Sequence, residues 1–227
     1  MLVTGFPAGM FQTNCYILAQ DNAKDCVVVD PGQDAAEPLN EFLTGSDLRP
    51  RAVLLTHGHL DHVWSAQAVA DRYEIPTYIH PGDRHMLSDP GVGMGSSLAP
   101  LLAGVTFTEP HEVIELADGD VVEHAGIRFV VDHTPGHTQG SVVLRTVATT
   151  PDGSEVPVAL TGDTLFEGSI GRTDLPGGNH EQLLESLAAK LLVLDDTTNI
   201  LPGHGRSSTI GRERASNPFL TGLAGSR

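Results

Sequence analysis

The 227-residue sequence has few cysteines and few basic residues, and each shortage removes a class of protein. Only Cys15 and Cys26 are present, both in strand-like stretches, which favours buried reduced thiols over a secreted disulfide framework; a bridge between them is the less favoured alternative. Lys and Arg total 13 against 29 Asp and Glu, for a net charge of −16, and no basic run compensates. Nucleic acid is therefore not an expected partner, because its phosphates would be repelled.

Signals for membranes and for export are also missing. No segment approaches the roughly 20 consecutive apolar residues that span a bilayer. Residues 1–8 lack the basic start, apolar stretch and small-residue cleavage site of a secretory signal. We therefore expect a cytoplasmic protein without a membrane partner. The length suits one large domain covering residues 1–227.

A serine nucleophile is not expected either. The sequence has no G-x-S-x-G elbow, since Gly168-Ser169-Ile170-Gly171 has the wrong spacing. What the sequence does contain is the stretch THGHLDH at residues 56–62, directly after the apolar strand pattern at 52–55. It is dense in side chains that bind a borderline divalent ion such as zinc: His57, His59, Asp61 and His62. The alternative interpretation is a polar surface loop.

Three more ligand candidates, His137, Asp163 and His204, each follow a strand pattern beside a glycine-containing turn. Strand ends at one edge of a pair of sheets lie close together, so their loops can converge, and glycine leaves room for that approach. The candidates then number seven, which exceeds the four ligands of one zinc ion and suits two ions that share a carboxylate.

The spacing of these candidates predicts how they divide between two ions. Adjacent Asp61 and His62 should face a different ion from His57. Asp163 should bridge, because a carboxylate has two oxygens. The remaining ligands follow: His57, His59 and His137 on one ion, and Asp61, His62 and His204 on the other.

The same centre predicts the cofactor and the charge of the substrate. Zinc is the first expectation for both ions, with iron or manganese as alternatives. Two divalent ions, two carboxylates and a bridging hydroxide sum to about +1, so a small anionic substrate is expected there. Asp30, before Pro31-Gly32, either orients a ligand imidazole or only starts a turn. His80, His85, His111, His124 and His180 lie outside the strand-end pattern and are not expected to be ligands, and His133 at most contacts one.

Strand and helix patterns alternate along the chain. Helices are predicted at 35–43, 63–73 and 181–192, the last capped by Asn179, and short strands fill most of the remainder. Two halves of strands followed by a helix indicate an α/β fold in which two sheets pack face to face with helices outside. Residues 88–99 read as a mobile loop beside a cleft, or as an ordinary surface excursion.

Several motifs together resemble a known family. They are VVVDPG at 27–32, LLTHGHLDH at 54–62, HTPGHT at 133–138, LTGDTLFEGSIGRTDLPGG at 160–178, LPGHG at 201–205 and STIGRERASNPFL at 208–220. The chain resembles the metallo-β-lactamase-fold hydrolases over nearly its whole length, and among them the short bacterial glyoxalase II-like proteins. The resemblance implies a four-layer αβ/βα sandwich and the seven ligands named above.

The resemblance also implies an activity: hydrolysis of a thioester such as S-lactoylglutathione by a metal-bound hydroxide. Asp61 would then position the hydroxide or accept its proton. Long glyoxalase II enzymes contact glutathione through a helical C-terminal domain, which we do not expect here, because the sequence ends about two dozen residues after His204. Arg172 is therefore our candidate for a substrate carboxylate, unless it forms a structural ion pair with Asp174.

Other functions are compatible with the same residues. A persulfide dioxygenase shares the fold but uses a single iron. β-Lactam cleavage is less favoured, because the ligand spacing and the GRTD segment resemble the thioesterase branch. A metal-dependent binding domain without activity is the non-enzymatic alternative, against which intact Asp61 argues.

Overall fold

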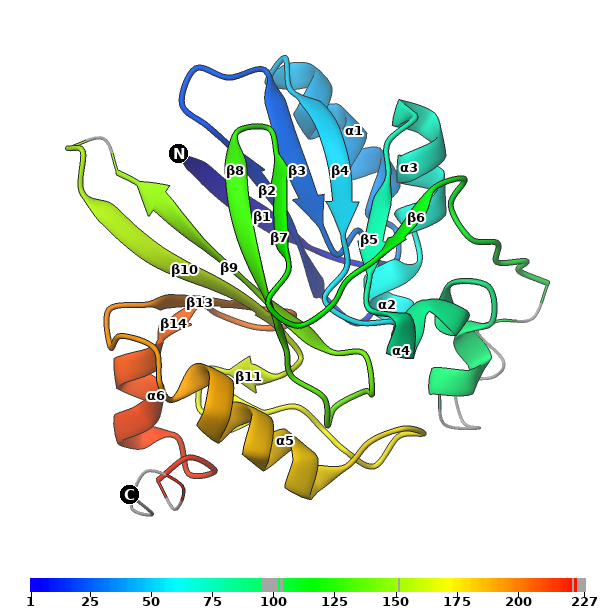
Figure 1. Ribbon diagram of the computed structural model, residues 1–227. Coiled ribbons are helices and arrows are strands. Elements are labelled where there is room, and N and C mark those ends of the chain that lie inside the picture. Colours follow the sequence, from blue (N-terminus) through cyan, green and yellow to red (C-terminus); the bar gives the residue numbers. More distant parts are fainter. Residues whose placement is uncertain (95–101, 103, 151, 222, 224–227) are drawn as a thin grey trace.

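The computed structural model describes residues 1–94, 102, 104–150, 152–221 and 223. Two six-stranded sheets pack face to face, and helices cover the outer face of each sheet (Figure 1). The predicted α/β sandwich of four layers is confirmed. Among the described residues, no helix combines the length and apolar character needed to cross a bilayer.

The first sheet keeps its strands in chain order. Its first three strands are antiparallel neighbours, and the next three join in parallel, with helices in the connections. The strands are β1 (Leu2–Ala8), β2 (Thr13–Ala19), β3 (Asp25–Val29), β4 (Arg49–Leu54), β5 (Thr77–Ile79) and β6 (Val113–Glu115).

The second sheet is antiparallel except where β10 pairs with β13 in parallel. Across the sheet the order is β14 (Ser208–Thr209), β13 (Asn199–Pro202), β10 (Glu155–Gly162), β9 (Val142–Thr149), β8 (Ile127–His133) and β7 (Val121–His124). A small separate hairpin, β11 (Leu165–Phe166) and β12 (Ser169–Ile170), follows β10.

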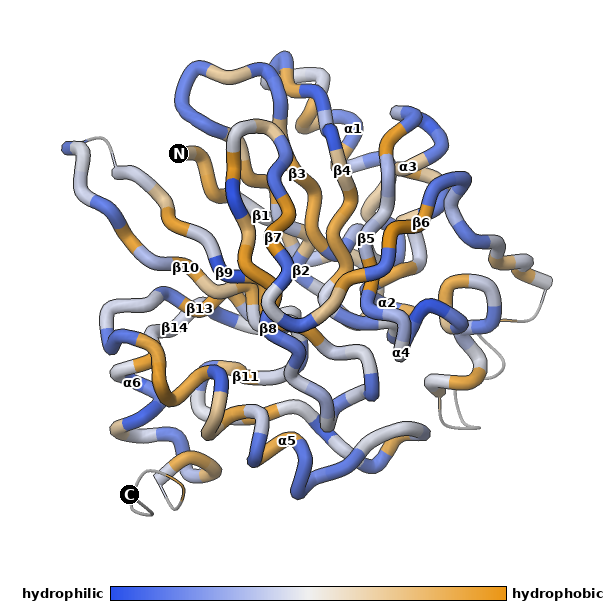
Figure 2. The backbone as a smooth tube through the Cα atoms, viewed as in Figure 1, coloured by the Kyte–Doolittle hydropathy of each residue, from blue (hydrophilic) through white to orange (hydrophobic). Residues whose placement is uncertain are grey.

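Alternation along the strands sorts side chains between layers. In β3, Val27 and Val29 face the core between the sheets, whereas Cys26 and Val28 face the helices. Apolar residues therefore run through the strand centres, as the orange segments of Figure 2 show. Cys15 and Cys26 are both free and fully buried, as predicted, and burial raises the pKa of the Cys26 thiol to about 12.

Helices of the outer layers bury apolar residues on the sheets. α1 (Ala36–Gly45) and α3 (Ala66–Tyr73) cover the first sheet. α5 (His180–Ser186), a π-helical turn (Leu187–Leu191) and α6 (Ile210–Ser216) cover the second. The predicted cap holds, because Asn179 Oδ1 accepts the Gln182 N–H at 3.0 Å.

One predicted helix is wrong in its extent. Residues 63–73 do not form a single helix, because α2 (Leu60–Val63) ends before α3 begins. The break lies at Ser65, whose N–H donates to Pro31 O at 2.9 Å instead of to a helical carbonyl. The carbonyl it would have used, that of Asp61, accepts the Gln33 N–H. The turn after β3 thus interrupts the helix.

The segment at 88–99 is partly structured. The structure shows short helix α4 (Pro81–Arg84) followed by 3₁₀ turns at His85–Leu87 and Pro90–Gly93. Within the predicted loop, residues 90–93 form a single 3₁₀ turn, and Gly93 and Met94 line a cavity, as expected of a loop beside a cleft; its mobility stays a prediction. Its remainder, residues 95–99, lies outside the described residues.

Candidate metal centre

The four candidate ligands of the THGHLDH stretch follow the end of β4 and lie in two successive backbone segments. His57 and His59 lie in an extended segment, and His59 itself is extended at φ −63° and ψ 144°. Asp61 and His62 lie in the first turn of α2, which starts directly after His59. Because the chain changes direction between the pairs, the two pairs can face different points.

The other three predicted ligands come from the second sheet. His137 follows β8, Asp163 follows β10, and His204 follows β13. The two sheets meet at this edge, where the Val142 N–H of β9 donates to Thr56 O at 2.8 Å. All seven predicted ligands therefore reach one place, each from a strand end, as the glycine-turn pattern indicated.

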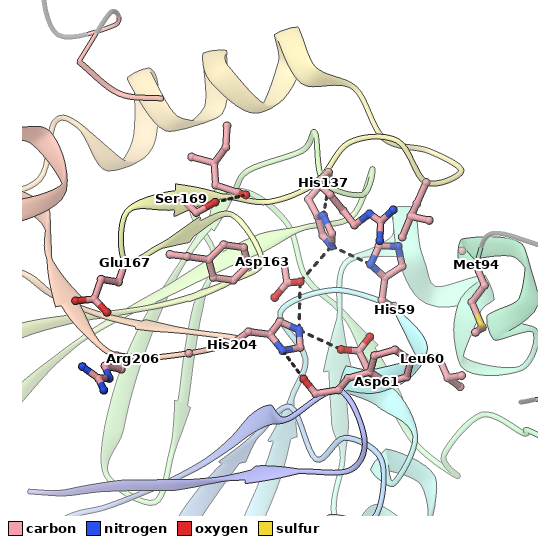
Figure 3. A pocket seen from close by; sticks show the side chains of 17 residues that line it. His59, Leu60, Asp61, Met94, His137, Asp163, Glu167, Ser169, His204 and Arg206 are labelled. Carbon is pink, nitrogen blue, oxygen red and sulfur yellow. Dashed lines mark hydrogen bonds and ion pairs between the residues drawn. The ribbon is translucent and has the colours of Figure 1, made fainter. Parts of the chain in front are cut away.

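Three histidines form one group, which we call the all-histidine triad: His57, His59 and His137. One ring nitrogen from each lies within 4.8 Å of the others. Figure 3 shows His59 and His137 pointing toward each other, with His59 Nδ1 and His137 Nε2 2.8 Å apart. His57 Nε2 is buried and has no hydrogen-bond partner among the described residues. A buried, unpaired lone pair is costly, so a divalent ion fits this triad.

A second group, the mixed triad, consists of Asp61, His62 and His204. Asp61 Oδ2 lies 3.1 Å from His204 Nε2 and 3.4 Å from His62 Nε2. One carboxylate and two imidazoles again suit a borderline divalent ion. The two triads have the same members as the predicted ligand sets of the two ions.

Asp163 lies between the triads. Its Oδ1 is 3.3 Å from His62 Nε2, and its Oδ2 is 3.6 Å from His137 Nε2 and 3.5 Å from His204 Nε2. Oδ1 is buried without a hydrogen-bond partner among the described residues. Asp163 thus contacts members of both triads, and its role as a bridge between two ions stays a prediction.

The outer nitrogens of three of the five candidate rings are held by acceptors. His62 Nδ1 lies 2.9 Å from Asp30 Oδ2, His137 Nδ1 donates to Arg172 O at 2.7 Å, and His204 Nδ1 donates to Phe11 O at 3.1 Å. A proton on the outer nitrogen leaves the inner lone pair free for a metal. Asp30 thus contacts the ring of a candidate ligand, and its role in orienting a metal-bound imidazole stays a prediction.

Asp30 also organises the all-histidine side. Its carboxylate accepts the Thr56 N–H at 2.8 Å and the Thr56 hydroxyl at 2.6 Å, and that hydroxyl lies 3.2 Å from His57 Nδ1. Sequence reasoning missed Thr56, although it opens the THGHLDH stretch. It also missed Thr13, whose hydroxyl donates to Asp61 Oδ2 at 2.8 Å, because Thr13 lies far from every motif.

Electrostatics differ between the triads. Burial lowers the pKa of His57 well below its usual range and that of His59 to about 3, so both rings are neutral ligands. Burial also opposes the charge of His62, but Asp61 and Asp163 outweigh it and raise the pKa of His62. The charge of His62 in turn keeps the pKa values of Asp61 and Asp163 below their usual range, against the effect of burial. Both carboxylates are therefore ionised at neutral pH.

Glycine is required at two points around the centre. A Cβ on Gly203, beside His204, would lie 2.3 Å from Asp163 Oδ1 and 2.5 Å from His62 Cε1. A Cβ on Gly32, in the turn after Asp30, would lie 1.9 Å from Asp61 O. Glycines in the LPGHG and VDPG motifs therefore allow the ligands to approach.

The remaining histidines lie outside both triads. His80 stacks on His133, with ring centroids 3.9 Å apart and planes at 12°. His133 Nε2 donates to Gln139 O at 2.9 Å, and among the described residues no hydrogen bond joins the His133 ring to a candidate ligand. His111 pairs with Asp71 on the surface, and His124 bonds to Tyr78.

The centre forms the floor of a cavity of about 650 Å³ (Figure 3). Asp61, Asp163 and His204 line it together with apolar side chains. These are Phe11, Leu60, Met94, Phe166, Ile170 and Leu175.

Two arginines reach the same cavity. Arg172 forms a bidentate ion pair with Asp174, with Nε 2.7 Å from Oδ1 and Nη2 2.8 Å from Oδ2. This is the alternative role considered for Arg172. Arg206 is exposed and has no ion-pair partner among the described residues.

A sandwich of this kind with a His/Asp cluster at the sheet edge is typical of a metal-dependent hydrolase. Residues 8–204 match the model of the metallo-beta-lactamase superfamily, and the chain belongs to that superfamily.

Relatives and solved structures agree with this assignment. An uncharacterized protein of Mycobacterium tuberculosis is 56% identical over 99% of this chain and 100% of its own length. Hydroxyacylglutathione hydrolase GloC of Haemophilus influenzae is 36% identical over 94% and 95% of the two chains. The structure is similar to that of the BLEG-1 B3 metallo-beta-lactamase, with a TM-score of 0.83 and 39% identity over 97% and 100%. It is also similar to a protein solved in a di-iron-bound form, with a TM-score of 0.76 and 33% identity over the same shares.

Proposed function

We propose that this protein is a dinuclear metal-dependent hydrolase that cleaves thioesters of the glyoxalase II type, S-2-hydroxyacyl thiols such as S-lactoylglutathione. One observation carries the proposal: two adjoining triads, with Asp163 between them, lie in the floor of an open cavity. The name of the relative GloC supports the thioester substrate, because its sequence aligns with nearly this whole chain.

The all-histidine triad would hold one ion and the mixed triad the other, with Asp163 shared. When bound, the two ions would activate a water molecule and polarise the substrate carbonyl. Zinc suits a donor set of imidazoles and carboxylates, and iron is supported by the di-iron form of a similar structure. Manganese remains the third candidate.

Asp61 is the residue that we propose to handle the proton of the attacking water. It lines the cavity, and its side chain is 19% exposed. The Thr13 hydroxyl and His204 both contact its Oδ2, which fixes the orientation of the carboxylate. Oδ1 is then left to orient the water and to accept a proton. The leaving group is a thiolate, which needs no dedicated acid.

The two arginines of the cavity are proposed to bind the anionic part of the substrate. Nε and Nη2 of Arg172 both bind the Asp174 carboxylate. Arg172 would therefore have to release Asp174 before these two nitrogens could bind a substrate carboxylate. Arg206 needs no such exchange. The apolar wall between them would exclude water from the acyl group.

The test is thioester cleavage by the metal-loaded protein, followed as loss of thioester absorbance with several cellular thiols. We expect oxygen-independent turnover with two ions per chain. We also expect Asp61→Ala to keep the fold and to lose turnover by about 10²- to 10⁴-fold, the usual contribution of a proton-transfer group. One iron per chain with oxygen uptake would instead identify a persulfide dioxygenase. Full binding of two ions without turnover of any thioester would favour a binding domain.

A further inference from the structure

Asp83 is a carboxylate with no assigned role, and it is fully buried at 0% exposure. It lies in α4, outside every motif that predicted a ligand. Its Oδ2 accepts the Gly58 N–H at 2.8 Å and the Thr138 hydroxyl at 2.6 Å, and its Oδ1 accepts the Gly140 N–H at 2.7 Å. Three donors from two distant loops thus converge on one side chain.

Those two loops carry the all-histidine triad. Gly58 lies between His57 and His59, and Thr138 directly follows His137. The Asp83 carboxylate therefore joins the backbone between His57 and His59 to the hydroxyl of the residue after His137, and none of its hydrogen bonds reaches the mixed triad. It is the one side chain among the described residues that hydrogen-bonds both loops in this way.

Glycines at two backbone positions allow both loops to approach Asp83. A Cβ on Gly58 would lie 2.9 Å from Asp83 Cβ, and a Cβ on Gly140 would lie 2.6 Å from Asp83 Cγ. Real Cβ atoms do not approach that closely, so glycine at both positions lets the loops reach the carboxylate. This also explains why glycine separates the first two histidines of THGHLDH.

α4 is anchored independently of the metal loops. His80 Nδ1 accepts the Gly82 N–H at 3.1 Å, and the Asp83 N–H donates to His80 O at 3.0 Å. On the other side, Arg84 pairs with Glu109 at 2.9 Å and with Glu115 at 3.0 Å. Asp83 is thus held in place from outside and can impose a position on the loops.

We propose that Asp83 is a positioning residue that sets the spacing of the all-histidine triad and thereby the affinity of its ion. This inference rests on the dinuclear centre of the proposed function but not on the substrate. Asp30 has the corresponding role for His62 in the mixed triad. Asp30 also reaches His57 through the Thr56 hydroxyl, so of the two carboxylates only Asp83 has hydrogen bonds confined to the loops of one triad.

The test is Asp83→Asn, measured as zinc affinity by chelator competition and as zinc content by elemental analysis. An amide of the same size cannot accept hydrogen bonds at its nitrogen, so it leaves a backbone N–H beside one triad loop unpaired. We expect one of two zinc ions to bind about 10- to 100-fold more weakly, as is usual when an outer partner of a ligand is lost, and the other to bind unchanged.

The matched control is Asp132→Asn. Asp132 is also buried, at 6% exposure, and pairs with Arg145, but it contacts neither triad. A substitution that only destabilises the fold should lower the melting temperature without changing the affinity for one zinc ion more than for the other. Asp132→Asn is expected to show this general effect alone.

Two backgrounds identify the affected ion. His204→Ala weakens the mixed triad, and adding Asp83→Asn to it should lower the affinity for the remaining ion. In the His137→Ala background, Asp83→Asn should cause no further loss of zinc affinity. The inference is overturned if wild-type protein binds two ions and Asp83→Asn binds both equally well, or if Asp83→Asn weakens the ion that remains in His137→Ala. If wild-type protein binds fewer than two ions, the dinuclear proposal itself fails.

Discussion

At the scale of single residues, two buried carboxylates support the two halves of the centre. Asp30 lies at 2% exposure with a positive φ of 50°, a conformation that Asp tolerates better than most residues. It accepts hydrogen bonds from Thr56 and lies 2.9 Å from His62 Nδ1. Such outer contacts fix which ring nitrogen of a ligand is free to bind metal.

Replacing Asp30 by Asn should weaken metal binding at the mixed triad. The NH₂ group of the Asn side chain would replace one carboxylate oxygen and place a donor against either the Thr56 N–H or the His62 ring. We expect about a 10- to 100-fold loss of affinity for one ion. Chelator competition measures it. Asp34→Asn is the control, because Asp34 is exposed and has a similar φ of 58°. Equal affinities of the wild type and Asp30→Asn would show that Asp30 is only a turn residue.

Arg206→Ala should raise KM for an anionic thioester by about fivefold and leave kcat unchanged, since an exposed ion pair contributes about 1 kcal/mol. Steady-state kinetics at low and high salt measure the effect, which salt should reduce. Arg172→Ala is the comparison, and a neutral thioester with the same acyl group is the control. An equal rise of KM for the neutral thioester would indicate lost packing instead of lost charge.

The convergence of the seven candidate ligands could be predicted from the sequence, because each of them follows a strand end and lies close to a glycine in the sequence. The residues that hold the ligands could not. Thr13 and Asp83 act through hydrogen bonds between segments far apart in the chain, and no local pattern marks them. Thr56 lies inside the THGHLDH stretch, but its hydrogen bond to Asp30 spans 26 residues. The carbonyls of Phe11 and Arg172 are still less visible, because any residue supplies a carbonyl.

At the scale of elements, the strands were predictable where apolar and polar residues alternate or where a short apolar run ends in a turn. The apolar strand pattern at 52–55 overlaps the end of β4. The helix predicted at 63–73 was wrong because its interruption at Ser65 depends on a bond to Pro31, which belongs to another segment. α6 was missed because its seven residues are mostly polar and only Ile210 is a buried apolar residue.

The start of α5 packs directly against the loop of His137. Gly136 has φ +137°, and a Cβ there would lie 2.3 Å from Leu183 N. Its carbonyl accepts the Asn179 N–H at 2.7 Å, at the cap of the helix. The helix can therefore approach the metal loop only while residue 136 has no side chain.

Gly136→Ala should destabilise the fold by more than the cost of backbone strain alone, which is about 1–3 kcal/mol. Urea unfolding measures the free energy. Gly119→Ala separates the two effects, because Gly119 has φ +82° and a Cβ there would meet no atom within 4 Å. Equal losses in the two variants would mean that α5 shifts freely and does not constrain the His137 loop.

At the scale of the whole molecule, the ligands join the two sheets. Four predicted ligands follow β4 of the first sheet, and three follow strands of the second. The all-histidine triad takes two members from the first sheet and one from the second, and the mixed triad is divided in the same way. Each ion would therefore connect both halves of the sandwich, in addition to the apolar core between them.

Metal removal should for this reason lower global stability and not only activity. A ligand present at about 1,000 times its Kd stabilises the folded state by about 4 kcal/mol. In a chain of this size each kcal/mol shifts Tm by about 2–4 °C, so loss of one ion should lower Tm by about 10 °C and loss of both ions by about 20 °C. Scanning calorimetry before and after chelation, with zinc restored as the reversal, measures the shift. His57→Ala, which has lost a ligand, should respond less to the chelator. If the fully loaded and metal-free proteins melt at the same temperature, the ions do not connect the sheets, and the core alone holds the sandwich together.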